Sequence, residues 1–373
     1  MLEFIFPKDG FFVNSSDGER TDNALTVTVR VKADKTPTIN GVKATPDGDC
    51  FTAKVTLSGQ RNCIVAKTDS EQKKISVFVL DKKYEKRYRI SSDDNIRFLK
   101  ELTEVDYKSV FDHPYLAVFK KAHDLYGAKV HINLFYEFCE KEREKFYDKH
   151  DYFNLSMMTD RYKDEFIANS DWFKFSFHSR AEFPEYPYEY ADRKTVHDDC
   201  VAVCREICRF AGKECLSDCM TMHWGAANRE VIRELRAMGI RGLVSNFKKN
   251  AEGKPIISFY LDNDLLENIE NRDFWMDTQE DMVFIKADGV LNIGKLDEVL
   301  CGVEKTMNDP HRGSFVELLI HEQYFYKDYS HHRPDFEERI LIPCKMLTEN
   351  GYTGALLTEV LTERSHCDYP EFF

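Results

Sequence analysis

The chain has 373 residues, of which 42% are hydrophobic and 31% are charged, and its formal net charge is −13. This composition is ordinary for a folded protein. The negative charge disfavours nucleic acids and anionic membrane surfaces as partners, because phosphate groups attract Lys and Arg. No run of about 18 or more uninterrupted apolar residues, the length that a membrane helix needs, occurs in the sequence. We therefore expect neither a nucleic-acid partner nor membrane insertion.

Two further features bear on the compartment. The first stretch, MLEFIFPKDGFF, lacks the basic residues and the long apolar core of a secretory signal. The chain has 11 Cys, and an odd number leaves at least one thiol unpaired in any disulfide scheme, which fits a reducing compartment. We therefore expect a cytoplasmic protein. At about 150 residues per domain, the length suits one large domain and one small one.

Residues 1–85 predict a small all-β domain. Apolar and polar residues alternate in LTVTVRVKA, and CFTAKVTLSG and KKISVFVL follow after turn signals such as INGV and PDGD. Short strands at intervals of about ten residues indicate an antiparallel sandwich. The stretch 38–68 resembles the immunoglobulin-like modules found beside carbohydrate-active domains. We interpret this domain as structural, with ligand binding as the alternative.

Residues 86–373 predict an α/β domain in which helical segments precede short apolar strands. Each of the clearest helical segments ends at a Gly, the residue expected just after a helix. Alternating helices and strands imply a parallel sheet, and this length is compatible with a closed α/β barrel, whose site lies at the carboxyl ends of the strands. The helix–strand pairs are HPYLAVFKKAHDLYG with AKVHINLFY, NREVIRELRAMG with IRGLVS, and FEERILIPCKMLTENG with YTGALLT.

Four of the predicted strands end in polar side chains that suit catalysis or metal binding. Each of these residues alone has a structural alternative, since the acidic pair could cap the next helix and a single His could be a buried, hydrogen-bonded group. Because the carboxyl ends of parallel strands meet at one edge, their recurrence favours a common site. The residues are Asp93 and Asp94, His178 and Glu182, His223, and His321 followed by Glu322.

The order of these motifs resembles the NodB-like polysaccharide deacetylases, a family of metal-dependent enzymes on a distorted (β/α) barrel. ISSDDN matches the family's opening Asp-Asp pair, and the stretch 178–182 matches its His-Ser/Thr-x-x-His motif. The stretch 221–225 corresponds to its Arg-x-Pro-x-Gly motif, and ELLIH, ending at His321, corresponds to its last motif. The resemblance covers residues 87–361. It implies a distorted barrel of the deacetylase type preceded by the small β-sandwich.

The sequence also departs from the family pattern at several motif positions. Glu182 stands where the family has its second metal-binding His, Thr221 replaces the Arg of the third motif, and His223 replaces its Pro. For the fourth motif we assign the stretch around Asp277 and Asp281. These departures leave open whether the chain is an active enzyme.

The resemblance also implies a chemical role for each candidate site residue. Asp94 and His178 would bind a divalent metal, with zinc the expected ion, and Glu182 or His223 would be the third ligand. Asp93 would be the general base and His321 the general acid. The reaction would remove an N- or O-acetyl group from a carbohydrate or glycoconjugate. The alternative is a catalytically inactive protein that keeps the fold and binds carbohydrate.

Other motifs have simpler interpretations. Cys200, Cys204 and Cys208 are spaced to share one face of a helix, but the sequence has no Cys-x-x-Cys pair of the kind that metal sites use. We interpret these cysteines as small buried apolar residues. The loops SHHRP and EFPEYPYEYAD could flank the site, the second by stacking on sugar rings.

Overall fold

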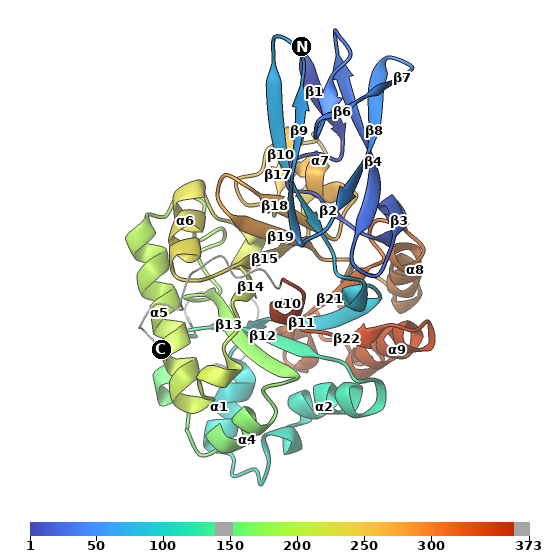
Figure 1. Ribbon diagram of the computed structural model, residues 1–373. Helices are drawn as coiled ribbons and strands as arrows, with labels where there is room; N and C mark the ends of the chain where they lie inside the picture. The colour runs from blue at the N-terminus through green and yellow to red at the C-terminus, as the bar shows by residue number, and fades with distance from the viewer. Residues whose placement is uncertain (139–151, 362–373) are drawn as a thin grey trace.

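The computed structural model describes residues 1–138 and 152–361, to which the statements below apply. It is a mixed α/β protein in which a group of N-terminal strands projects from one end of a larger α/β part (Figure 1). Within the described residues, no helix combines the length and the apolar character that crossing a membrane requires.

The N-terminal strands form two five-stranded sheets. In one sheet the order is β1-β4-β8-β7, with β3 beside β4, and in the other it is β2-β10-β9-β5-β6. The predicted alternation is confirmed, since Val27, Val29 and Val31 of β4 are fully buried while residues between them are not. The immunoglobulin-like assignment and the boundary at residue 85 stay predictions. The strands are β1 (Leu2–Phe6), β2 (Phe12–Val13), β3 (Gly18–Arg20), β4 (Leu25–Ala33), β5 (Thr38–Ile39), β6 (Val42–Lys43), β7 (Thr45–Asp47), β8 (Cys50–Leu57), β9 (Arg61–Lys67) and β10 (Gln72–Val79).

The larger part contains a six-stranded sheet and a four-stranded sheet. The first has the order β13-β12-β11-β21-β20, with β22 beside β11, and all of its pairs are parallel. The second has the order β14-β15-β19-β18, in which β18 alone runs antiparallel to its neighbour. The strands are β11 (Arg87–Asn95), β12 (Val130–Phe135), β13 (Phe173–Ser179), β14 (Cys219–Thr221), β15 (Gly242–Ser245), β18 (Phe274–Asp277), β19 (Met282–Lys286), β20 (Gly289–Val290), β21 (Phe315–His321) and β22 (Thr353–Gly354). A separate hairpin pairs β16 (Lys248–Lys249) with β17 (Pro255–Ile256).

Backbone contacts link these two sheets at both flanks. On one flank, the segment before β14 forms a parallel bridge with β13, and the Ser217 amide donates to the Phe175 carbonyl at 2.9 Å. On the other flank, the Ala287 amide donates to β15 at Ser245, and the next amide, of Asp288, donates to β21 at Glu317. The chain therefore passes directly from one sheet to the other. A closed barrel stays a prediction.

Helices surround these sheets (Figure 1). The helix predicted over residues 113–127 is α2, which has Pro114 in its first turn and ends at Gly127, whose φ of 64° is left-handed as expected for a C-terminal cap. The helices are α1 (Arg97–Glu104), α2 (Pro114–Tyr126), α4 (Lys163–Ala168), α5 (Arg193–Phe210), α6 (Arg229–Ala237), α7 (Asn263–Glu270), α8 (Leu296–Met307), α9 (Phe336–Glu349) and α10 (Leu357–Val360).

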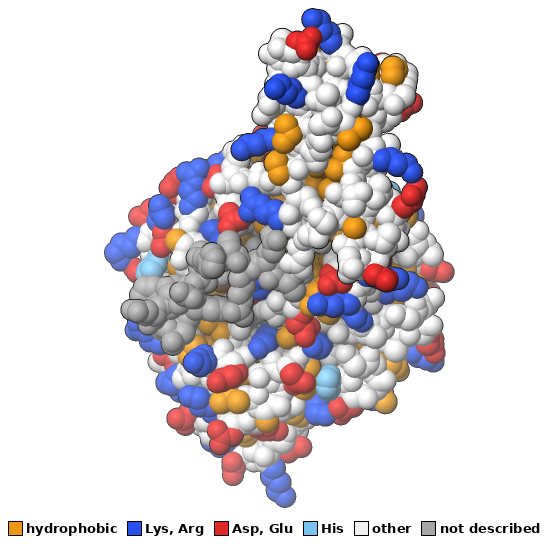
Figure 2. All heavy atoms as spheres, viewed as in Figure 1, with side chains coloured by type: hydrophobic (Ala, Val, Ile, Leu, Met, Phe, Trp, Pro, Cys, Tyr) orange, Lys and Arg blue, Asp and Glu red, His pale blue; other side chains and the backbone are white. Residues whose placement is uncertain are grey.

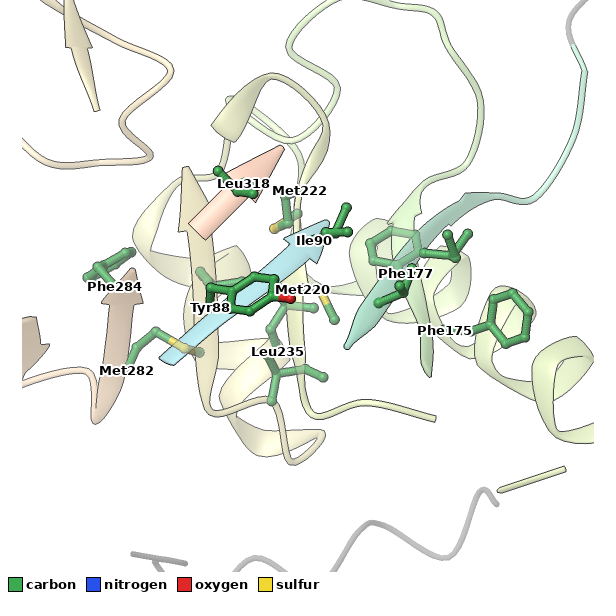
Figure 3. Packing of buried hydrophobic residues seen from close by; sticks show 14 of the residues in the cluster. Tyr88, Ile90, Phe175, Phe177, Met220, Met222, Leu235, Met282, Phe284 and Leu318 are labelled. Atoms are coloured by element: carbon green, nitrogen blue, oxygen red, sulfur yellow. The ribbon is translucent and has the colours of Figure 1, made fainter. Parts of the chain in front are cut away.

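Strand β11 is buried on both faces, and the two faces differ in character. Tyr88 and Ile90 belong to the apolar cluster, together with residues of β13, β14, β19 and β21 (Figure 3). Arg89, Ser91 and Asp93 alternate with them and are equally buried. Because successive side chains of a strand point to opposite faces, the polar face of β11 leads along the strand to its carboxyl end.

The N-terminal strands contact the larger part near β18. Arg272 donates two hydrogen bonds to the Asp17 carboxylate, at 2.7 and 3.0 Å, and the Trp275 indole donates to the Asp9 carbonyl at 3.0 Å. Acidic and basic side chains are interspersed over the outer surface that Figure 2 shows.

Candidate metal centre

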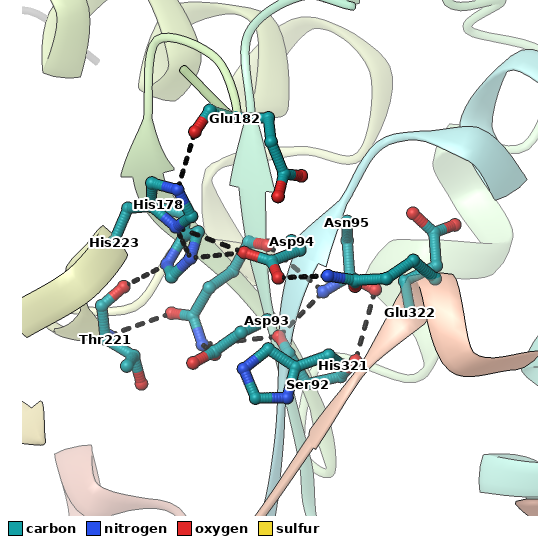
Figure 4. A network of polar contacts seen from close by, with 12 residues as sticks. Ser92, Asp93, Asp94, Asn95, His178, Glu182, Thr221, His223, His321 and Glu322 are labelled. Atoms are coloured by element: carbon teal, nitrogen blue, oxygen red, sulfur yellow. Dashed lines mark hydrogen bonds and ion pairs between the residues drawn. The ribbon is translucent and has the colours of Figure 1, made fainter. Parts of the chain in front are cut away.

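Three side chains from different parts of the parallel strands converge on one point (Figure 4). Asp94 lies near the end of β11, His178 lies near the end of β13, and His223 begins a short 3-10 turn just after β14. The His178 Nε2 lies 3.0 Å from Asp94 Oδ1, and the His223 Nδ1 lies 3.1 Å from His178 Nε2 and 3.2 Å from Asp94 Oδ1. All three residues are buried.

Backbone carbonyls orient both histidine rings. The Thr221 carbonyl contacts His178 Nδ1, and the Glu182 carbonyl lies 2.8 Å from His223 Nε2. A carbonyl only accepts hydrogen bonds, so each of these nitrogens carries the proton. In the neutral rings, the lone pairs of His178 Nε2 and His223 Nδ1 therefore face each other and Asp94. Backbone partners of this kind commonly fix the tautomer of metal-binding histidines.

This arrangement fits a divalent metal ion. Two nitrogen lone pairs and a carboxylate oxygen that face one another repel unless a positive charge lies between them. Atoms bound to one tetrahedral ion at about 2.0–2.2 Å lie roughly 3.3–3.6 Å apart, and the three separations here are only slightly shorter. Two imidazoles and a carboxylate are ligands that zinc and other first-row metals accept. Asp94, His178 and His223 could therefore hold such an ion.

Asp94 has a strained backbone and a strongly perturbed carboxyl group. Its φ of 61° lies in the left-handed region, which is uncommon for a residue other than Gly. Burial alone would raise its pKa, but hydrogen bonding to His178 and His223 holds the pKa well below the usual range. The second oxygen, Oδ2, accepts a hydrogen bond of 2.6 Å from the Gln323 amide. Both carboxylate oxygens therefore have defined partners.

The two histidines differ in their protonation. Burial lowers the pKa of His178 below its ordinary value. Burial also acts to lower the pKa of His223, but the hydrogen bond and charge of Asp94 outweigh it, so that the pKa is raised. The extra positive charge that the cluster needs is therefore a proton on His223 or a metal ion in its place.

Asp93 and His321 lie side by side near this centre. They are paired positions on the parallel strands β11 and β21, and both line the cavity that contains the metal-site residues. Burial and the adjacent Asp94 raise the pKa of Asp93 well above the usual range, while a hydrogen bond of 2.7 Å from the Asn133 amide opposes the shift. A nearby divalent cation would also favour the ionised form of Asp93.

His321 has an amide rather than a carboxylate as its ring partner. Its Nδ1 lies 2.9 Å from Asn292 Oδ1, which also accepts from the His321 backbone amide at 3.1 Å. Burial lowers the pKa of His321, and the uncharged amide cannot reverse this shift as a carboxylate would. The neutral ring therefore donates through Nδ1 and keeps a lone pair on Nε2.

A cavity of about 340 Å³ contains the centre. Every described residue that lines it lies between Asp93 and Tyr329, so the N-terminal strands contribute none. Aromatic side chains contribute to its wall, namely Phe183, Trp224, Tyr324 and Tyr329. The Trp224 ring lies 5.0 Å from that of Tyr186, which comes from the Tyr-rich loop after Glu182. The cavity thus combines a polar floor with partly aromatic walls.

Several residues assigned from the sequence lie elsewhere. Glu182 lines the cavity, but its carboxylate is not in the three-residue metal group, and its carbonyl instead orients His223. Asp277 accepts from the Tyr260 hydroxyl at 2.5 Å, Asp281 pairs with Arg236, and neither residue lines the cavity. The assignment of the fourth motif to them stays a prediction. The hydrogen-bond partner of the His321 ring is Asn292.

Among the described residues no cysteine lines this cavity, and His331 contacts the Tyr324 and Tyr329 rings of its wall. Cys200, Cys204, Cys215 and Cys219 are buried and Cys208 is half-buried, with no disulfide among the described residues. His331 and His332 do not line the cavity. The interpretation of the buried cysteines as packing residues agrees with this burial.

A buried polar chain extends from Asp93 away from the cavity, and no periodic pattern in the sequence predicts it. All residues of this chain other than Asp93 are fully buried. The contacts run from Asp93 to Asn133, from Asn133 to Ser176 at 2.6 Å, from Ser176 to His131 at 2.9 Å, from His131 to Arg89, and from Arg89 to Glu317 at 2.7 and 2.9 Å. This chain fixes the floor of the site.

Comparison with known proteins finds solved structures of low similarity, two of which are described here. No protein-family model matches the chain, and no curated protein matches it. A CE4 family pseudoenzyme from Bacillus anthracis is 13% identical, with a TM-score of 0.32, over 81% of this chain and 84% of that one. Agd3, a carbohydrate deacetylase, is 10% identical, with a TM-score of 0.39, over 94% of this chain and 69% of that one. Similarity at this level does not establish a shared activity.

Proposed function

We propose that this protein is a metal-dependent hydrolase that removes an acyl group, such as N- or O-acetyl, from a carbohydrate. The observation that carries the proposal is the set of three inward-facing ligand atoms of Asp94, His178 and His223, separated by 3.0–3.2 Å. Zinc is the ion that we propose, because a carboxylate and two imidazoles with an open position are typical of its catalytic sites. The parallel strands that carry the site are proposed to form the distorted barrel.

The proposed chemistry divides between the metal and two side chains. A bound ion would lower the pKa of a water molecule and polarise the acyl carbonyl. Asp93 would accept the proton of the attacking water, because Asn133 holds its carboxylate at the cavity floor. His321, at the paired position on β21, would deliver a proton to the leaving nitrogen or oxygen through Nε2. To do so it must first gain a proton, which its lowered pKa makes harder.

The carbohydrate substrate is supported by the sequence motifs and by the cavity wall. The motif order from ISSDDN to ELLIH resembles that of polysaccharide deacetylases, and the residues of the matching positions meet in one cavity. Trp224 lies on the wall of this cavity and contacts the ring of Tyr186. Aromatic rings of this kind offer the apolar surface on which one face of a pyranose can pack.

A catalytically inactive carbohydrate-binding protein is the second candidate, and one observation favours it. The ring partner of His321 is the amide of Asn292, which leaves the histidine neutral where a general acid must be protonated. Such a protein would keep the cavity and the metal group but release no acyl group.

Acetate release separates the two candidates. The zinc-loaded and EDTA-treated proteins are incubated with N-acetylated chito-oligosaccharides and with O-acetylated xylan, and free acetate is measured. If the protein is a hydrolase, we expect it to release acetate from one of the two polymers only when zinc is bound. We expect the Asp93→Asn variant to release none. Sugar binding by calorimetry, without acetate release from either polymer, would support the binding protein instead.

A further inference from the structure

We propose that Gln323 is a positioning residue for the metal centre, which holds Asp94 so that only one of its carboxylate oxygens faces the ion. The inference rests on the metal site of the proposed function, and it assigns a role to a residue outside the three-residue ligand group. Gln323 lies two residues after His321, the last residue of β21, and its side chain is buried.

The two oxygens of Asp94 have separate partners. Oδ1 faces the two histidine nitrogens, whereas Oδ2 accepts a hydrogen bond of 2.6 Å from Gln323 Nε2. A carboxylate whose second oxygen is occupied in this way binds a metal through one oxygen. Without that hydrogen bond the carboxylate could rotate and bind through both oxygens, or turn away from the histidines. The Gln323 amide thus sets how Asp94 meets the ion.

The orientation of the Gln323 amide follows from its partner. An ionised carboxylate accepts hydrogen bonds but donates none, so the nitrogen of the amide must face Asp94. The other end of the amide, Oε1, is buried and has no hydrogen-bond partner among the described residues. The buried Gln323 amide therefore uses its nitrogen to bond Asp94, while its oxygen stays unsatisfied, which costs stability.

Neighbouring contacts hold Gln323 in place against Asp94. The carboxylate of the preceding residue, Glu322, accepts hydrogen bonds from the backbone amides of Ile96, Arg97 and Phe98 at 2.7, 3.0 and 2.7 Å. These amides lie two to four residues after Asp94 in the chain. Glu322 therefore fixes the turn that carries Gln323 against the segment that carries Asp94. The segment that follows the left-handed Asp94 is thus held in place.

Metal binding tests this role without a substrate. Gln323→Met keeps the length of the side chain but cannot donate, and Gln323→Asn keeps the amide but is too short to reach Asp94. For both variants, prepared as full chains, we expect a zinc affinity about 10–100-fold below that of the unchanged protein, measured by competition with a chelator. We also expect a different visible spectrum of the cobalt(II)-loaded protein, because its intensity depends on coordination number. A purely structural role of Gln323 would leave that spectrum unchanged.

Asn292→Leu is the matched control. It also removes a buried amide that lines the same cavity, but this amide contacts His321 and no metal ligand, so zinc affinity and the cobalt spectrum should not change. Thermal unfolding of the EDTA-treated proteins identifies a variant that fails to fold. If one Gln323 variant fails to fold, the zinc affinity and the cobalt spectrum of the other Gln323 variant test the inference. If a folded Gln323 variant has the zinc affinity and the cobalt spectrum of the unchanged protein, Gln323 does not position Asp94. The metal site of the proposed function would be unaffected by that result. Absence of zinc binding by the unchanged protein would overturn the metal site of the proposed function, and the inference with it.

Discussion

Asp93 and Asp94 are neighbours in sequence, yet they have different surroundings. In a regular strand they would point to opposite faces, but the left-handed φ of Asp94 turns its carboxylate so that both residues line one cavity. Neither caps the following helix, because Ile96 is the N-cap residue of α1 and makes no side-chain capping bond. The structure therefore favours a role at the site over the capping alternative.

Asp93→Asn and Asp94→Asn should have different effects. The amide oxygen of Asn at position 93 can still accept from Asn133 but cannot take a proton, so we expect turnover to fall by about 10²–10⁴-fold with zinc content unchanged. Asn at position 94 removes the charged ligand, so we expect the zinc to be lost. Acetate release and metal analysis of the purified variants check both results. Full activity of Asp93→Asn would exclude Asp93 as the base.

Zinc affinity should depend on pH through His223. The pKa of this residue is raised by Asp94, so below that pKa the ring carries a proton that a metal ion must displace. His178, whose pKa is lowered, already has its lone pair available. Affinity should therefore fall as the pH is lowered, by about tenfold per pH unit where one proton is released for each ion bound. Zinc titrations at several pH values measure it, and a constant affinity would contradict the proposed ligand set.

The choice between His223 and Glu182 as third ligand could not be made from the sequence. A spacing of four residues places side chains together on a helix, but His178 lies in a strand and Glu182 in the bend that follows it. The direction of a side chain in such a bend depends on tertiary contacts. Asn133, Asn292 and Gln323 were missed for a related reason, since a single buried amide leaves no periodic pattern.

At the scale of elements, one side chain connects two segments that are far apart in the chain. Glu322, directly after β21, satisfies three backbone amides at the start of α1. Free amides at a helix start favour a negative charge. The same contact holds the end of β21 beside the end of β11, where the acidic pair lies. Helix capping and the geometry of the site are therefore coupled here.

Glu322→Gln should destabilise the protein measurably. The substituted amide presents hydrogen atoms to one or more of the backbone amides, so bonds to a charged acceptor are lost and we expect a loss of about 1–3 kcal/mol in the free energy of unfolding. Urea unfolding of the metal-free protein measures it. Glu104→Gln, at the other end of α1, is the control. The Glu104 side chain is 54% exposed and pairs with Lys100, so the loss in the free energy of unfolding should stay below about 1 kcal/mol. Equal effects of the two substitutions would contradict the capping role.

The elements themselves were largely predictable, because their signals are local. Period-two alternation predicted β4, the turn signals before CFTAKVTLSG predicted β8, and the glycines that end helices predicted the ends of α2 and α9 within two residues. The buried polar side of β11 was not predictable. An Arg is ordinarily expected to face solvent. Arg89 is buried because its side chain contacts His131 and Glu317, which lie on neighbouring strands. Pairing between distant residues has no local signal.

For the molecule as a whole, the contact between the N-terminal strands and the α/β part is partly polar. Arg272 and Asp17 form a buried ion pair across it, with side chains 7% and 1% exposed. Asp17 precedes β3, and Arg272 lies in the short segment between α7 and β18. Among the residues that the structure describes, none that lines the cavity takes part in this contact. We therefore expect the N-terminal strands to support stability rather than metal binding.

Arg272→Met should lower stability and leave the metal site intact. Removing one partner leaves the Asp17 carboxylate buried without its main counter-charge, which costs about 3–5 kcal/mol in comparable pairs. Thermal and urea unfolding measure the loss. The control is Lys8→Met, because Lys8 pairs with Glu267 across the same contact while both side chains are exposed, so the effect should be below about 1 kcal/mol. A fall in the zinc affinity of folded Arg272→Met protein would show that the N-terminal strands influence the site.

Calorimetric titration of zinc into the EDTA-treated and dialysed full chain is the direct test of the metal centre. Asp94, His178 and His223 form one group of inward-facing ligands, so we predict one tightly bound ion per chain. We also predict that Asp94→Asn and His178→Ala each abolish this binding while the proteins remain folded. Absence of zinc binding by the unchanged chain, or binding that survives both substitutions, would contradict the account.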